Sequence, residues 1–150
     1  MAGTLALAAC GTPAYIETEN IGQRTTDADQ ITQYFSGSFF VGPEGGGIYY
    51  GDDQSISSIN KDTNYLTVGT WSVRALVGGP ALCEEVQSHQ LKEGNLRHSD
   101  VKRTCQIVYL QPDGTAKLDE MGGPIYTFPK PSKRYPDRAH FEKLRKQMGV

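Results

Sequence analysis

The chain has 150 residues, of which 37% are hydrophobic, and its formal net charge is −2. This length fits one domain, and the near-neutral charge excludes a general affinity for nucleic acid. No apolar run is long enough to form a membrane-spanning helix. The 17 glycines and 8 prolines favour many turns and few long helices.

Residues 1–10 are typical of the end of a bacterial export signal. An apolar stretch leads into Leu-Ala-Ala-Cys10, which resembles a lipobox, where the cysteine thiol receives a diacylglycerol. The residue after Cys10 is Gly11 and not aspartate, which favours sorting of the lipoprotein to the outer membrane over retention in the inner membrane. We therefore expect Cys10 to anchor the protein to membrane lipid in the cell envelope, on the periplasmic side. Because no Lys or Arg precedes Cys10, we expect the complete signal to start upstream of Met1. The alternative is an apolar tail with an ordinary buried cysteine.

The number of cysteines, 3, is consistent with an exported protein in which one cysteine is lipidated and the other two form a disulfide. If Cys10 is lipidated, Cys83 and Cys105 remain as a pair, and both lie in segments typical of strands. A disulfide between them would close a loop of roughly twenty residues and stabilise the fold by about 3 kcal/mol. The alternative is two free thiols in the cytosol. Zinc is disfavoured because there is no CxxC motif and no nearby histidine pair.

The chain divides into a tether and a domain. Residues 11–25 are polar and lack periodicity, which predicts a flexible tether. Residues 26–150 are expected to form a single β-rich domain that starts with a helix from Thr26 or Asp27 to Phe35. Short runs with apolar alternation and bounding turn residues predict the strands 38–41, 47–50, 54–60, 65–76, 82–86, 104–110, 115–118 and 125–128.

Strands that follow one another closely predict an antiparallel meander, curled into a small, lipocalin-like barrel or a sandwich. Asp113-Gly114 provides the strongest hairpin signal in the series. A final helix is expected near residues 137–148. We expect its apolar stripe to pack on the domain: Phe141, Leu144 and Met148.

Several short motifs occur in a fixed order. They are Gly-Gly-Ile-Tyr-Tyr-Gly-Asp-Asp (46–53), Gly-Thr-Trp-Ser-Val (69–73), Leu-Cys83, Cys105 and Asp113-Gly114. In this order the chain resembles the DUF995 family of small exported proteins from alphaproteobacteria, over roughly residues 30–128. The resemblance implies a β-rich fold and a cell-envelope location, but no activity and no functional residues. Gly69-x-Trp71 is also similar to the lipocalin signature, which suggests a tryptophan that closes one end of a barrel.

No catalytic constellation stands out, because GxSxG, HExxH and P-loop motifs are absent. Four carboxylates lie near glycines, where turn chemistry already explains them: Asp52, Asp53, Asp113 and Glu120. The alternative is a periplasmic hydrolase of cell-wall or glycan material that uses such carboxylates in pairs. His89, His98 and Asp100 lie in a polar segment between the cysteine strands, which is expected to be a flexible loop, and their spacing matches no metal site. We expect no cofactor and no metal.

The leading interpretation is a non-catalytic envelope protein that binds a small ligand or serves as an interaction module. Six aromatic residues are expected to line or fill the barrel: Phe39, Tyr49, Tyr65, Trp71, Tyr109 and Phe128. For Trp71, core packing is the favoured role. Basic residues crowd the C-terminal stretch: Lys130, Lys133, Arg134, Arg138, Lys143, Arg145 and Lys146. They predict a solvated helix face or, as the alternative, contact with anionic lipid or an acidic envelope polymer.

Overall fold

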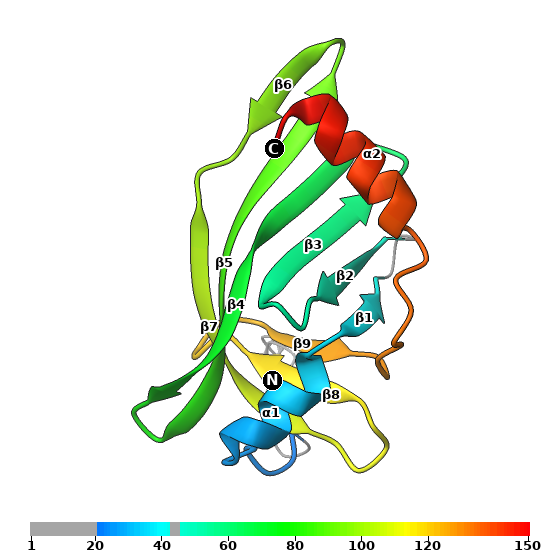
Figure 1. Ribbon diagram of the computed structural model, residues 1–150. Coiled ribbons are helices and arrows are strands. Elements are labelled where there is room, and N and C mark those ends of the chain that lie inside the picture. Colours follow the sequence, from blue (N-terminus) through cyan, green and yellow to red (C-terminus); the bar gives the residue numbers. More distant parts are fainter. Residues whose placement is uncertain (1–20, 43–45) are drawn as a thin grey trace, which may run out of the picture.

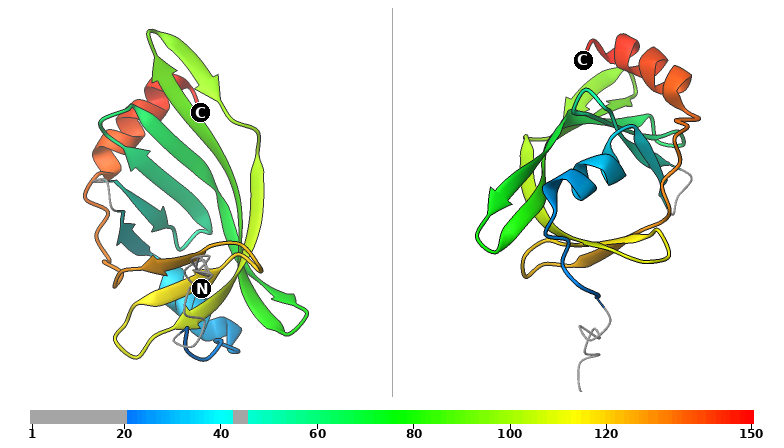
Figure 2. Two further views of the ribbon diagram at one scale, coloured as in Figure 1. Left: turned by 180° about the vertical axis from the view of Figure 1, so that it is seen from behind. Right: turned by 60° about the horizontal axis from the view of Figure 1, so that its bottom comes forward.

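The computed structural model describes residues 21–42 and 46–150. The predicted lipidation site Cys10 and most of the predicted tether lie outside the described residues. The described chain forms an antiparallel sheet of nine strands that curls into a nearly closed barrel (Figure 1). A short helix lies at one end of the barrel and a C-terminal helix on its outside (Figure 2). The predicted mainly β fold with a helix near each end is confirmed.

The sheet is a meander in which nearly every strand pairs with the next strand in the sequence. The exception is β6, which pairs only with β5, so that β7 lies on the other part of β5. The elements in chain order are α1 (Ala28–Phe35), β1 (Ser38–Val41), β2 (Gly47–Tyr50), β3 (Ser55–Asn60), β4 (Tyr65–Leu76), β5 (Gly79–Lys92), β6 (Asn95–His98), β7 (Lys102–Leu110), β8 (Ala116–Asp119), β9 (Ile125–Phe128) and α2 (Arg138–Met148).

The largest difference from the predicted elements concerns β5. It was expected over residues 82–86, but it spans Gly79–Lys92 and pairs with the full length of β4. The segment expected to be a polar loop therefore continues β5 and returns as β6. The polar side chains of this segment give little local indication of a strand. The strand forms because its backbone groups hydrogen-bond to those of β4.

Helix α1 begins where the sequence predicts. The Asp27 carboxylate accepts a hydrogen bond from the backbone N–H of Asp29 at 2.8 Å, which caps the first turn. Ile31 and Phe35 are four residues apart, so they share one face of the helix, and both are fully buried. The chain turns out of the helix through Gly37, whose φ of +62° is favourable for glycine. Helix α1 thereby covers one end of the barrel (Figure 2).

The inner core joins α1 to the inward face of the sheet. It consists of Ile31, Phe35, Phe40, Tyr50, Ile56, Trp71, Leu82, Val108 and Leu118. Trp71 is 4% exposed, and its indole N–H donates to the carbonyl of Gly51 at 2.9 Å. This geometry agrees with the packing role expected for Trp71.

A second core lies on the outer face of the barrel. Ile59 is three residues from Ile56 in the same strand, so the two point to opposite faces of the sheet. Helix α2 buries the predicted stripe against Ile59 and Leu66, through Phe141, Leu144 and Met148. The expected packing of this helix on the domain is therefore observed.

The barrel has a seam, because β1 and β9 do not pair with each other. Residues 129–137, here called the strap, lead from β9 along β1 to α2 (Figure 1). The backbones of Phe39 and Ser132 exchange two hydrogen bonds of 2.7 and 2.8 Å. The Lys133 ammonium donates to the carbonyl of Ser36 at 2.9 Å. The strap thus covers the free edge of β1, which would otherwise be open to other strands.

Residues 21–25, predicted as the end of a flexible tether, lie against the barrel. The backbone N–H of Thr25 donates to the carbonyl of Val108 at 2.9 Å, and the Thr25 hydroxyl accepts from the N–H of Leu110 at 3.0 Å. The Arg24 guanidinium donates to the carbonyl of Gly79 at 3.0 Å. The folded part therefore begins before residue 26, where the sequence places its start.

Candidate functional site

A cavity of about 410 Å³ lies between α2 and the outer face of the sheet. Strands β2 to β4 form one wall, and the strap and α2 form the other. Small-molecule sites in proteins commonly have volumes of a few hundred Å³. We call this cavity the α2 groove and define it by six of its lining residues: Tyr49, Asp53, Ser57, Tyr135, Arg138 and Arg145.

An aromatic stack fixes the start of α2 at the groove. The ring of Tyr135 in the strap lies between Phe39 and Tyr49, with ring centroids 5.3 and 5.0 Å apart and planes tilted by 22° and 17°. The later part of the helix is held by Leu144 and Met148 in the outer core. Hydrophobic contacts therefore fix both parts of α2, while several polar side chains line the space at the groove.

Two arginines reach the groove from the helix. Arg138 and Arg145 are seven residues apart, so they lie on the same side of α2, about 10 Å apart along its axis. Among the described residues, neither guanidinium makes an ion pair with an Asp or Glu side chain. Arg145 donates through Nε to the main-chain oxygen of Val150 at 2.8 Å, which leaves the rest of its donors available.

Two acidic residues also line the groove, but one of them is already engaged. The hydroxyl and the backbone N–H of Ser55 donate to the Asp53 carboxylate at 2.6 and 3.0 Å. These bonds hold the pKa of Asp53 below its usual value, and the charge of Arg138 adds to the effect. Asp53 is therefore an ionised, structurally committed carboxylate. The second acidic residue, Glu142, lies on α2 and is exposed.

The groove also holds a buried donor with no partner. The hydroxyl of Tyr135 is inaccessible to solvent and makes no hydrogen bond of normal geometry, although the Ser57 hydroxyl is near enough to favour the phenolate. Burial outweighs this effect and raises the pKa of Tyr135 to about 12. The phenol therefore stays neutral and can donate its proton to an acceptor in the groove. A buried polar group without a partner is costly, and ligand binding is one way to satisfy it.

The six aromatic residues expected to line one pocket are divided between two faces of the sheet. Trp71 and Phe128 lie in or against the inner core. Phe39 and Tyr49 stack on Tyr135 at the outer face. Of the other two, Tyr65 is 40% exposed and Tyr109 is half-buried on β7. Of the six, only Tyr49 lines the α2 groove.

Sequence reasoning missed Tyr135 as a site residue. It lies in the Pro-rich, basic stretch before α2, where no periodic pattern marks a buried position. The available signal was a single aromatic residue directly before Pro136.

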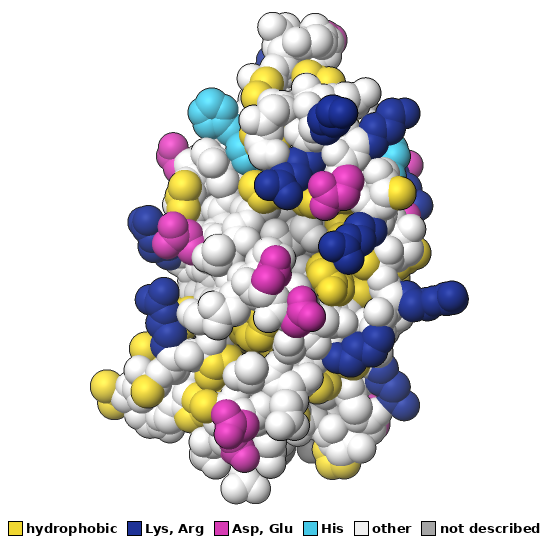
Figure 3. All heavy atoms as spheres, viewed as in Figure 1, with side chains coloured by type: hydrophobic (Ala, Val, Ile, Leu, Met, Phe, Trp, Pro, Cys, Tyr) yellow, Lys and Arg dark blue, Asp and Glu magenta, His cyan; other side chains and the backbone are white. Residues whose placement is uncertain are grey.

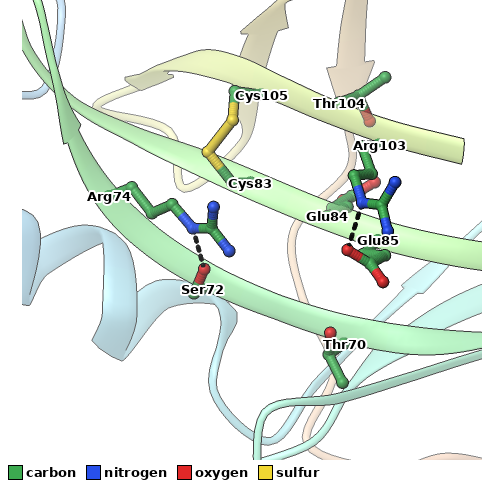
Figure 4. A pocket seen from close by; sticks show the side chains of 9 residues that line it. All are labelled: Thr70, Ser72, Arg74, Cys83, Glu84, Glu85, Arg103, Thr104 and Cys105. Carbon is green, nitrogen blue, oxygen red and sulfur yellow. Dashed lines mark hydrogen bonds and ion pairs between the residues drawn. A yellow bond between two sulfur atoms is a disulfide. The ribbon is translucent and has the colours of Figure 1, made fainter.

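The predicted disulfide between Cys83 and Cys105 is present. The two residues are direct partners in the register of β5 and β7, and they line a small cavity of about 130 Å³ (Figure 4). In its lining, Arg103 donates to the Glu85 carboxylate at 2.6 Å, and Arg74 donates to the hydroxyl of Ser72 on the same strand at 3.1 Å. Both cysteines are oxidised, so neither provides a thiolate nucleophile.

His89 and His98 lie on paired strands, which corrects the expectation of a flexible loop between the two cysteine strands. His89 and His98 are direct partners across β5 and β6, with ring centroids 6.3 Å apart. His89 is buried, its Nδ1 has no hydrogen-bond partner, and burial lowers its pKa. Asp100 is exposed beyond β6. Within residues 21–42 and 46–150, no group of three or more His, Cys, Asp or Glu side chains could hold a metal.

One buried carboxylate is absent from the predicted candidates. Glu84 lies on the inner face of β5 and accepts a hydrogen bond of 2.5 Å from the phenol of Tyr50. Burial raises the pKa of Glu84, and the bond from Tyr50 opposes this only in part. The alternation of Leu82, Glu84 and Val86 places all three on one face, so the pattern could have identified it. Asp113, in contrast, accepts from Thr115 two residues on, as a turn residue does.

Comparison of the chain with family models, curated proteins and solved structures finds no match. The resemblance to DUF995 proteins therefore stays a prediction. Neither helix in the described part of the chain is long and apolar enough to cross a membrane.

Proposed function

We propose that this chain is a non-catalytic cell-envelope protein that binds a small anionic ligand in the α2 groove. The observation that carries the proposal is the buried hydroxyl of Tyr135, which makes no hydrogen bond, in the same groove as Arg138 and Arg145, neither of which pairs with an Asp or Glu side chain among the described residues. A cavity of about 410 Å³ has room for a ligand of small-molecule size.

The two arginines of the lining favour an anion, whereas the Asp53 carboxylate is engaged by Ser55 and Glu142 is exposed on α2. Arginine offers a planar fork of donors that fits a carboxylate or phosphate in a bidentate manner. The neutral phenol of Tyr135 would add one more donor. Val68 and Phe141 provide apolar contact for the remainder of the ligand. Together these groups suit a compact organic acid or phosphate ester.

A binding role fits the groove better than catalysis. Asp53 is held ionised by Ser55, so it is poorly suited to act as a general acid. The hydrolase alternative finds its best support elsewhere, in Glu84, whose pKa is raised by burial and, to a smaller extent, by the charge of Glu120. Glu84 is already bonded to Tyr50 in the core, however, which favours a structural role.

The envelope location is supported by two features of the chain. One is the lipobox-like sequence that ends at Cys10. The other is the Cys83–Cys105 disulfide, because disulfides persist mainly in oxidising compartments. To test lipidation, the full-length reading frame is expressed in a Gram-negative host and the membrane-extracted product is weighed. We expect an acylated chain that begins at Cys10, and a chain that retains residues 1–9 without acyl mass would contradict this.

Ligand binding is tested with phenyl phosphate and benzoate as probes, by calorimetry or chemical-shift titration. We expect Arg138→Gln to weaken binding about tenfold, the loss that accompanies one charge-assisted hydrogen bond. Tyr135→Phe should weaken it several-fold, because the ring remains and only the donor is lost. Lys143→Gln is the matched control, since it removes the same charge from α2 at a side chain that does not line the groove. Equal losses in Arg138→Gln and the control, or no binding of either probe at millimolar concentration, would refute the proposal.

A further inference from the structure

The hairpin between β4 and β5 projects beyond the barrel (Figures 1 and 2). From Arg74 to Ala81 the two strands pair only with each other, because the pairing of β3 with β4 reaches no further than Ser55 opposite Thr70, and β7 pairs with β5 only from Leu82 onward. No charged residue occurs over residues 75–82, and Val77 at the tip is fully exposed. An apolar side chain held in water at the end of a rigid hairpin is a candidate contact surface.

The described chain starts at the same end of the molecule. The carbonyl of Ile21 accepts a hydrogen bond of 2.9 Å from the side chain of Gln111, in the turn between β7 and β8. Three residues later, the Arg24 guanidinium donates to the carbonyls of Gly79 and Pro80 at 3.0 and 3.3 Å. The chain that leads from Cys10 therefore arrives beside the exposed hairpin.

The number of residues between Cys10 and Ile21 limits the distance between an anchor at Cys10 and the end of the barrel that carries the β4–β5 hairpin. A fully extended chain from Cys10 to Ile21 spans about 37 Å, and a flexible one averages about 18 Å between its ends. Helix α2 and the β5–β6 hairpin lie at the other end of the barrel (Figure 1). An anchor at Cys10 thus brings the β4–β5 hairpin, and not α2, closest to the membrane.

The charges of the two ends differ. Lys and Arg side chains gather over α2 (Figure 3). The end with the hairpin carries both signs of charge: Asp27, Asp29 and Asp113 are exposed at the start of α1 and in the β7–β8 turn, and the basic residues Arg24, Arg74 and Lys130 lie on or against the hairpin and this turn. These two elements touch, because the phenol of Tyr34 donates to the carbonyl of Gly114. Because acidic and basic side chains are mixed at this end, it has little net attraction to an anionic surface, and a contact with lipid there depends on apolar insertion.

We propose that the β4–β5 hairpin tip, residues 75–78, docks on a lipid bilayer and inserts Val77 below the headgroups, with the α2 groove facing away from the membrane. The inference rests on the proposed anchor at Cys10 for its direction. Insertion by one or two apolar side chains is weak alone, but a covalent anchor raises the local concentration of bilayer and makes it sufficient.

The experiment uses the full chain with its disulfide intact, in which Cys10 is the only free thiol. Cys10 is coupled to a maleimide lipid in zwitterionic vesicles whose acyl chains carry bromine, a quencher of tryptophan. Val77→Trp reports on the hairpin tip. Leu96→Trp is the matched control, because Leu96 is also exposed but lies on β6 at the other end. Trp71 is buried and contributes the same background to both variants.

We expect at least twofold stronger quenching of Val77→Trp than of Leu96→Trp, with little effect of salt. Equal quenching of the two variants, or none in either, would overturn the proposal. Quenching of Leu96→Trp that grows with anionic lipid and falls with salt would instead assign the membrane contact to the basic α2 end. Because the chemical coupling replaces natural acylation, these outcomes are independent of whether the exported protein carries acyl mass.

Discussion

Removal of the disulfide by Cys83→Ala together with Cys105→Ala should destabilise the protein by about 3.4 kcal/mol. This magnitude follows from the sequence separation of 22 residues, because the crosslink lowers the entropy of the unfolded chain in proportion to the logarithm of the loop length. Replacing both residues avoids leaving an odd thiol in the folded barrel.

The native fold should survive the change. Strands β5 and β7 keep their register from Leu82 to Val86, so the backbone pairing does not depend on the crosslink. The free energy of unfolding is measured by urea titration under non-reducing conditions, with the fluorescence of Trp71 as the probe. Trp71 is suitable because it is the only tryptophan and is buried in the inner core. We expect the urea midpoint to fall by roughly 1–3 M.

The slope of the titration separates two explanations. A crosslink that acts on the unfolded chain keeps it compact, so its removal should expose more surface on unfolding and raise the m-value. Arg103→Gln is the control near the same site, since its ion pair with Glu85 is exposed to solvent and should contribute little to stability. A loss below about 1 kcal/mol in the cysteine variant, with an unchanged m-value, would refute the entropic reasoning.

Three further predictions concern the barrel itself. Trp71→Phe should cost roughly 2–4 kcal/mol in urea titrations followed by circular dichroism, because it removes one of the two hydrogen bonds to the carbonyl of Gly51 and opens a cavity in the inner core. Burial raises the pKa of Glu84, so the stability of the wild-type protein should fall as pH rises above about 4.5. Glu84→Gln should remove this fall and be the more stable of the two proteins at pH 8 in thermal scans. Parallel pH profiles of the wild-type protein and the variant would contradict this. Gly69→Ala should prevent a native fold, because a Cβ there would lie 2.0 Å from the carbonyl oxygen of Glu85; a cooperative transition at the wild-type temperature would contradict this.

Local patterns in the sequence were sufficient for much of the barrel. The strands at residues 38–41, 47–50, 65–76 and 125–128 have the predicted boundaries. Alternating side chains and turn residues act over a few neighbours, so this information is contained in short segments. The cap of α1 at Asp27 and the stripe of α2 were readable for the same reason. The Cys83–Cys105 disulfide could be expected because, once Cys10 is assigned to lipid attachment, these two cysteines are the pair that remains.

The site itself was decided by tertiary structure. The period of a strand shows which side chains share a face, but not which face α1 or α2 will cover. For this reason the aromatic residues expected in one pocket separate into an inner core around Trp71 and an outer stack around Tyr135.

The extension of β5 to Lys92 depended on hydrogen bonds from β4, many residues away in the sequence. The position of Tyr135 beside Tyr49 likewise required the strap to cross the seam of the barrel. Local sequence therefore determined where strands and helices form, whereas contacts between distant segments determined which polar groups were left without partners at the α2 groove.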